Sequence, residues 1–168
     1  MCHQPVPVPV AGLGLTSVNT AATPSNLYLV VGYDGSAPAG RALDAAVRLL
    51  SGREGRIDVV YVGHIPGVDM MSADAVVEER VTLDDIERDL RASAAEQLRD
   101  QEDRWQFERR EGLIADQLLA AAKAIHESHP DDVVSVVVGS SSQALHRMLG
   151  SAAVSLARHS PVPVVIVP

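Results

Sequence analysis

Residues 133–168 read VVSVVVGSSSQALHRMLGSAAVSLARHSPVPVVIVP, and this stretch decides the fold. The run 133–138 is apolar enough for a strand that is covered on both faces. The loop after it is rich in glycine and serine, and a short helix is predicted over 148–159. The chain closes with a strand flanked by prolines, over 161–168. Such continuous valine and isoleucine runs suit a parallel sheet buried between helical layers.

The same alternation extends towards the N-terminus. Three earlier apolar runs predict strands over 27–33, 57–63 and 105–111. The helices between them are predicted from Ser36 to about Leu50, from Thr82 to about Gln101, and over 113–128. Ser36 and Thr82 are each placed to cap a helix, and acidic residues follow Thr82 where the helix dipole favours them. The segment 68–81 fits either a loop or an irregular helix.

Five strands and four helices therefore define an α/β protein. We expect one domain over 27–168, with three layers (α/β/α) around a five-stranded parallel sheet. Residues 1–26 contain the alternation PVPVPV and are predicted to be a flexible N-terminal extension, with an added edge strand as the alternative. Ligands of such sheets bind beyond the carboxyl ends of the strands, where the strand order reverses. The segments leaving those ends are GYDGS, VGHIPG and GSSSQALHRMLGS.

Composition limits the classes of partner. The formal net charge of −8 argues against binding to a nucleic-acid backbone, which clustered basic residues attract. No apolar run approaches the roughly 20 residues that span a bilayer, so no membrane association is expected. The first residues lack basic side chains and are broken by prolines, unlike a signal peptide, so the expected location is cytoplasmic. The single cysteine, Cys2, excludes an internal disulfide.

Three motifs resemble the universal stress protein family: VVGYDGS at 30–36, YVGHIP at 61–66, and the whole of 133–168. The resemblance covers about 27–168. It implies a Rossmann-like sheet in the order 3-2-1-4-5 and a homodimer that forms through the final strand, 162–167. It also implies a cleft for ATP or AMP at the ends of strands 1 and 4, with Mg²⁺ accompanying ATP.

The glycine-serine loop departs from the phosphate loop of the ATP-binding members in two ways. Their loop reads glycine, two residues, glycine, nine residues, glycine, then serine or threonine. Here Gly139 and Gly150-Ser151 match the ends, but Ser142 replaces the second glycine and only seven residues separate it from Gly150. A serine in a left-handed conformation costs roughly 1–2 kcal/mol. The two-residue shortening matters more, because it redirects several N–H groups that must converge on the anion. We interpret the loop as a modified phosphate loop.

The resemblance assigns site residues by position. Gly32, Tyr33 and Asp34 flank the nucleoside, although Asp34-Gly35 also suits a plain turn. Val62 meets the adenine through its backbone, whereas the residue itself suggests only a core position. His146 and Arg147 form a basic pair in the loop, which either binds phosphate as well or is exposed to solvent. The expected phosphate contacts are Gly139, Ser140, Ser141, Ser142, Gly150 and Ser151.

Two function classes remain open. The first is a regulatory protein that binds an adenine nucleotide, with at most slow ATP hydrolysis, because neither a general base nor a pair of metal-binding acids is evident. The second is a homodimeric interaction module whose phosphate loop has degenerated. No catalytic or metal-ligating residue is assigned: His126 and His129 lie near a helix end without a clear third ligand, and Ser36 is not in a GxSxG elbow.

Overall fold

The computed structural model describes residues 25–63, 73–101, 103–140 and 151–168. All but two residues of the predicted N-terminal extension therefore lie outside the described part, as does most of the phosphate loop. Within the described residues, five parallel strands form one sheet: β1 (Leu27–Gly32), β2 (Gly55–Gly63), β3 (Trp105–Glu111), β4 (Val133–Gly139) and β5 (Val164–Val167). Their order is β3-β2-β1-β4-β5, which confirms the predicted topology.

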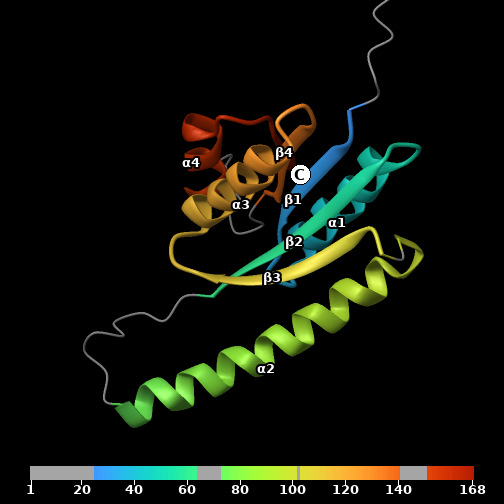
Figure 1. Ribbon diagram of the computed structural model, residues 1–168. Coiled ribbons are helices and arrows are strands. Elements are labelled where there is room, and N and C mark those ends of the chain that lie inside the picture. Colours follow the sequence, from blue (N-terminus) through green and yellow to red (C-terminus); the bar gives the residue numbers. More distant parts are fainter. Residues whose placement is uncertain (1–24, 64–72, 102, 141–150) are drawn as a thin grey trace, which may run out of the picture.

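Helices cover both faces of the sheet (Figure 1). On one face lie α1 (Ala37–Leu50) and α2 (Ala73–Gln97), followed by the short 3₁₀ helix η2 (Arg99–Gln101). On the other face lie α3 (Ile114–Ser128) and α4 (Ser151–His159). The three-layer α/β/α architecture is the predicted one.

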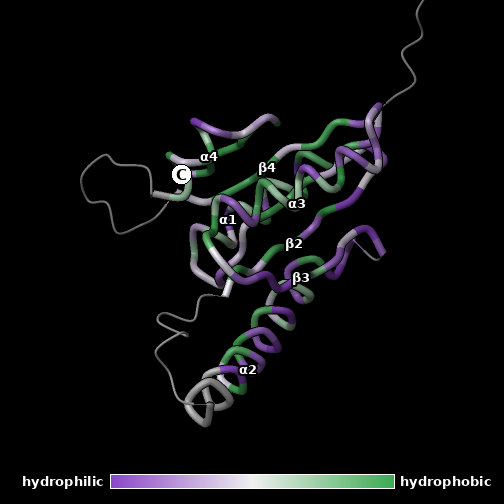
Figure 2. Tube along the Cα trace, turned by 60° about the vertical axis from the view of Figure 1, so that its left-hand side comes forward, coloured by the Kyte–Doolittle hydropathy of each residue, from purple (hydrophilic) through white to green (hydrophobic). Residues whose placement is uncertain are grey.

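The core is divided by the sheet into two apolar clusters, because successive side chains of a strand point to opposite faces. Along β1, Leu29 and Val31 pack towards α1 and α2, whereas Val30 packs towards α3 and α4. Figure 2 shows the sheet as largely hydrophobic at β4, with long hydrophilic stretches on β3 and α2. The sheet is thus apolar at its centre and polar towards the β3 edge.

The polar edge includes one buried carboxylate. Asp58 of β2 is only 4% exposed. Its carboxylate accepts hydrogen bonds from the guanidinium of Arg56 and the amide of Gln106, the latter on β3. A buried carboxylate is tolerated only when it is paired in this way.

Three predicted starts of elements within the described residues were wrong by two residues or more. The second helix begins at Ala73 rather than Thr82, because residues 73–81 contain alanine, glutamate and arginine, which favour helix, and no glycine or proline. Thr82 therefore lies inside α2 and does not cap it. β2 begins two residues earlier than predicted, at Gly55, and the last strand begins only at Val164, because Pro161 and Pro163 lack the N–H that a sheet ladder requires. Among the helices that the structure describes, none has the length and apolarity that a membrane crossing requires.

Candidate functional site

A pocket of about 410 Å³ lies at the carboxyl ends of β1, β2 and β4, a volume within the usual range for small-molecule sites. The strand order reverses between β1 and β4, so this is the place where a sheet of this type accommodates a ligand. Most of the wall is apolar and comes from β2, β4 and the starts of α1, α3 and α4. The polar side chains in the described wall belong to Tyr33, Asp34, Ser36 and Tyr61.

Five of the predicted site residues line this pocket together: Gly32, Tyr33, Asp34, Val62 and Gly139. Ser140 is described but does not line the pocket, and its backbone N–H donates to the carbonyl of Val167 at 2.7 Å, so that this N–H is not available to a phosphate. Ser151 is the first residue of α4. The other predicted phosphate contacts lie outside the described residues: Ser141, Ser142, His146, Arg147 and Gly150.

Asp34 belongs both to the turn after β1 and to the pocket wall. Its Oδ1 accepts a hydrogen bond from the N–H of Ser36 at 3.0 Å, which closes the turn through Gly35, a residue with a φ of 76°. Ser36 then caps α1, because its Oγ accepts from the N–H of Ala39 at 3.3 Å. The second carboxylate oxygen of Asp34 makes no hydrogen bond with any described residue. Asp34 is thus fixed by the turn and still presents an acceptor to the pocket.

Gly139 brings the end of β4 against the start of α1. A Cβ atom at this position would come within 2.4 Å of the carbonyl carbon and oxygen of Pro38. Because these are backbone atoms, no rotamer change relieves the clash. Gly139 and Pro38 therefore form a close-packed floor beneath the pocket, and any larger residue forces the two elements apart.

The backbone of Val62 extends past the end of the neighbouring strand. The last β1–β2 pair is Gly32 with Val60, and the carbonyl of Val60 accepts from the N–H of Tyr33 at 3.0 Å. Because residues two apart in a strand direct their N–H and C=O groups to the same side, Val62 directs its own towards the space beyond β1. At that point the chain has already turned away at Asp34.

Tyr61 was missed by the sequence interpretation, which treated 57–63 as an apolar core strand. It is a half-buried aromatic residue that lines the pocket beside Val62. Burial raises the pKa of the Tyr61 phenol above its usual value of 10.0, the charge of Arg109 lowers it, and the charge of Asp34 raises it. The phenol is therefore protonated at neutral pH. The available signal was a hydroxylated aromatic side chain at the carboxyl end of an otherwise aliphatic strand.

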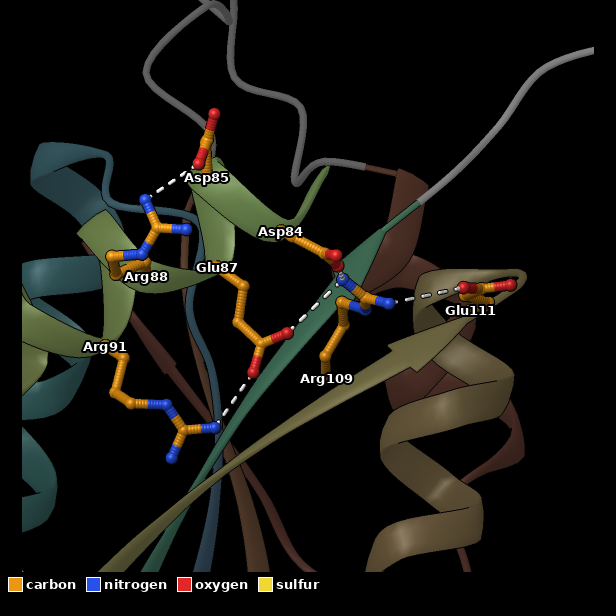
Figure 3. Close-up of polar contacts among 7 residues, drawn as sticks. All are labelled: Asp84, Asp85, Glu87, Arg88, Arg91, Arg109 and Glu111. Carbon is orange, nitrogen blue, oxygen red and sulfur yellow. Dashed lines mark hydrogen bonds and ion pairs between the residues drawn. The ribbon is translucent and has the colours of Figure 1, made fainter. Parts of the chain in front are cut away.

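A cluster of ion pairs holds α2 beside this wall (Figure 3). Arg109 of β3 contacts Asp84 at 2.5 Å and Glu87 at 3.3 Å, both on α2. Glu87 also pairs with Arg91 at 2.9 Å, and the Arg91 guanidinium lies 4.8 Å from the centre of the Phe107 ring. These carboxylates raise the pKa of Arg109 further above its already high value, mainly through the hydrogen bond to Asp84. The cluster ties α2 to the edge strand next to β2.

Comparison with protein families matches residues 28–168 to the universal stress protein family. This match covers almost everything after the N-terminal extension, so the chain belongs to the universal stress protein family. No protein with a curated description matches the sequence closely enough to be counted as a relative.

Solved structures of the family share the fold. Universal stress protein UspA from Lactobacillus plantarum has a TM-score of 0.63 and 19% identity, over 86% of this chain and 99% of that one. A universal stress protein in complex with cAMP has a TM-score of 0.58 and 24% identity, over 86% and 98%. A family protein from Arabidopsis thaliana with AMP bound has a TM-score of 0.53 and 12% identity, over 84% and 90%.

Proposed function

We propose that this universal stress protein binds an adenine nucleotide, ATP or AMP, in the pocket at the ends of β1 and β4 and acts as a nucleotide-dependent regulatory protein. The observation that carries the proposal is the position of the 410 Å³ pocket at the reversal of strand order, with five expected site residues in its wall. The structural neighbours that contain cAMP and AMP support a nucleotide as the ligand class.

The parts of the nucleotide are assigned by the chemistry of the wall. The N–H and C=O of Val62 offer a donor and an acceptor side by side, which suits the edge of adenine. Asp34 lies beside the nucleoside, because a carboxylate repels phosphate and accepts from hydroxyl groups. The phosphates then extend towards Gly139 and the glycine-serine loop, where Ser151 begins α4 and helix N–H groups favour an anion.

We propose binding rather than catalysis as the activity. In the part of the pocket wall that the structure describes, Asp34 is the only charged residue. Its free carboxylate oxygen is assigned to the nucleoside rather than to the phosphates, which leaves it poorly placed as a general base for hydrolysis. Occupancy of the pocket, rather than turnover, then carries the regulatory signal.

We also propose that a second copy of the chain covers β5. The strand consists of valine and isoleucine, all of them half-exposed, and in the described structure it pairs only with β4. An apolar edge strand requires a partner or a cover, and an identical edge is the partner that the family resemblance implies.

The proposal is tested by denaturing freshly purified protein and analysing the released small molecules by mass spectrometry, together with calorimetric titration with ATP and AMP. We expect a released adenine nucleotide or binding in the micromolar range. Asp34→Ala should weaken binding about tenfold or more, since it removes a charge-assisted acceptor. The matched control is Asp131→Ala, an exposed aspartate before β4 at the opposite end of the sheet, which should bind normally.

A negative result in both measurements would contradict the proposed nucleotide binding. If no nucleotide is released and none of the titrations produces heat at millimolar concentration, nucleotide binding is wrong. The remaining function is then a dimeric interaction module whose loop is a remnant of a phosphate site.

A further inference from the structure

We propose that the hydroxyl of Tyr61 donates a hydrogen bond to a sugar hydroxyl of the bound nucleotide, so that Tyr61 and Asp34 together select ribose. This inference rests on the proposed function and assigns the part of the pocket that recognises the sugar. It concerns a residue that begins the motif YVGHIP but was not assigned to the site by the sequence or by the resemblance.

The first observation is the position of Tyr61. It lies in β2 directly before Val62, and both residues line the pocket together with Asp34. In this shared wall the charge of Asp34 also raises the pKa of the Tyr61 phenol. A ligand whose base lies against the backbone of Val62 therefore has its sugar near this pair.

The second observation is that the Tyr61 hydroxyl has no hydrogen-bond partner among the described residues. The hydroxyls of the other two tyrosines do: Tyr33 contacts Ser93 Oγ at 3.0 Å, and Tyr28 contacts His129 Nδ1 at 3.5 Å. A hydroxyl in a pocket wall that no described protein group engages is a donor available to a ligand. The pKa of this phenol lies above its usual value of 10.0, so the hydroxyl is a donor at neutral pH.

The third observation is that the guanidinium beside Tyr61 in the sheet, that of Arg109, is already paired with carboxylates. Tyr61 and Arg109 are direct partners in the β2–β3 register, so their side chains lie next to each other on the same face of the sheet. Figure 3 shows the Arg109 guanidinium directed at Asp84 and Glu87 of α2. Because these carboxylates hold Arg109, the ligand meets the neutral phenol rather than a cation.

The chemistry of this pair fits a hydroxyl group. Asp34 supplies only an acceptor, and Tyr61 is available as a donor. A sugar hydroxyl donates and accepts at once, so a single group can satisfy both residues. A phosphate group cannot donate to Asp34 and is repelled by its charge. The pair therefore recognises the uncharged sugar of the nucleotide.

The test compares Tyr61→Phe with the wild type by calorimetric titration with AMP, 2′-deoxy-AMP and 3′-deoxy-AMP. We expect the substitution to weaken AMP binding roughly 3- to 10-fold, the usual loss for one neutral hydrogen bond. With the deoxy ligand that lacks the contacted hydroxyl, the variant and the wild type should bind equally. The matched control is Tyr28→Phe, which removes a tyrosine hydroxyl at the opposite end of β1 and should leave AMP affinity unchanged.

The outcomes separate the two proposals. Absence of nucleotide binding to the wild type would overturn the proposed function and this assignment together. Normal AMP affinity in Tyr61→Phe, while the wild type binds, would overturn the role of Tyr61 alone. An equal loss for AMP and both deoxy ligands would show that Tyr61 contacts another part of the nucleotide, and the ribose assignment would be wrong. Circular dichroism of the variant confirms that a loss of affinity is not a loss of fold.

Discussion

Gly139 occupies the point where β4 meets the first turn of α1, and its missing side chain is what permits the contact. We expect Gly139→Ala to destabilise the protein by about 1–3 kcal/mol, the usual cost of overpacking, because the new Cβ meets the backbone of Pro38. Nucleotide affinity should fall as well, since the pocket floor is displaced. Urea unfolding and calorimetric titration measure the two effects.

Gly52→Ala is a useful comparison for this prediction. A Cβ atom at Gly52 meets nothing within 4 Å, although its φ of 71° disfavours a side chain. Gly52→Ala should therefore lower the stability of the protein only through backbone strain, and nucleotide binding should be unaffected. If Gly139→Ala retained wild-type stability and affinity, the close packing against Pro38 would not shape the pocket.

For single residues, the sequence predicted part of the pocket wall. Gly32, Asp34 and Gly139 lie in short segments at strand ends, where turn residues leave a clear signal, and all three line the pocket. Val62 depends on its backbone, which leaves no trace in the side chain, and only the family resemblance indicated it. Tyr61 was not assigned to the pocket, because the hydrophobic pattern of a strand does not show whether its last residues face a core or a pocket.

The contact between α2 and β3 depends on charge as well as on apolar packing. Arg109 is 23% exposed and pairs with Glu87, which is 24% exposed, and with the more exposed Asp84. We expect Arg109→Met to lower the free energy of unfolding by about 1 kcal/mol at low salt, because these half-buried pairs are only partly screened. The difference from the wild type should shrink at about 0.5 M salt. Urea unfolding at both salt concentrations measures it.

Arg88→Met is the matched control for Arg109→Met. Arg88 pairs with Asp85 on the surface of α2, where both side chains are well exposed (71% and 60%), so its loss should change stability very little. Equal effects of the two substitutions would show that the Arg109 cluster does not fasten α2 to the sheet.

Elements were predictable where the hydrophobic period was strong. β4 and the helix over 113–128 followed directly from the pattern, as did the cap at Ser36. The start of α2 did not, because Thr82, Asp84 and Asp85 form a convincing helix start inside a longer helix. A capping pattern indicates that a helix can begin at a residue, but it does not prevent the preceding residues from being helical too.

For the whole molecule, alternation of strands and helices predicted the three layers, whereas the strand order came from the family resemblance. The homodimer through β5 remains a prediction. We expect Val165→Glu to convert the proposed dimer into monomers, because the charge would be placed at the apolar β5 edge through which we propose that two copies meet. Sedimentation velocity measures the oligomeric state.

Val165 also packs partly on the α1 side of the core, so circular dichroism must confirm that the variant is folded. Leu49→Glu adds the same charge to an exposed leucine (41%) on α1 and should leave the dimer intact. An unchanged dimer in folded Val165→Glu would place the interface elsewhere.

The two edge strands of the sheet, β3 and β5, differ in chemistry. This difference limits how many copies of the chain can join edge to edge. β3 ends in Glu108, Arg109, Arg110 and Glu111, whereas β5 consists of valine and isoleucine. When two β5 edges meet, the joined sheet has a charged strand at each outer side, so a third copy finds no matching edge. The proposed dimer therefore has no apolar edge left for further copies, and high concentration should yield dimers instead of fibres.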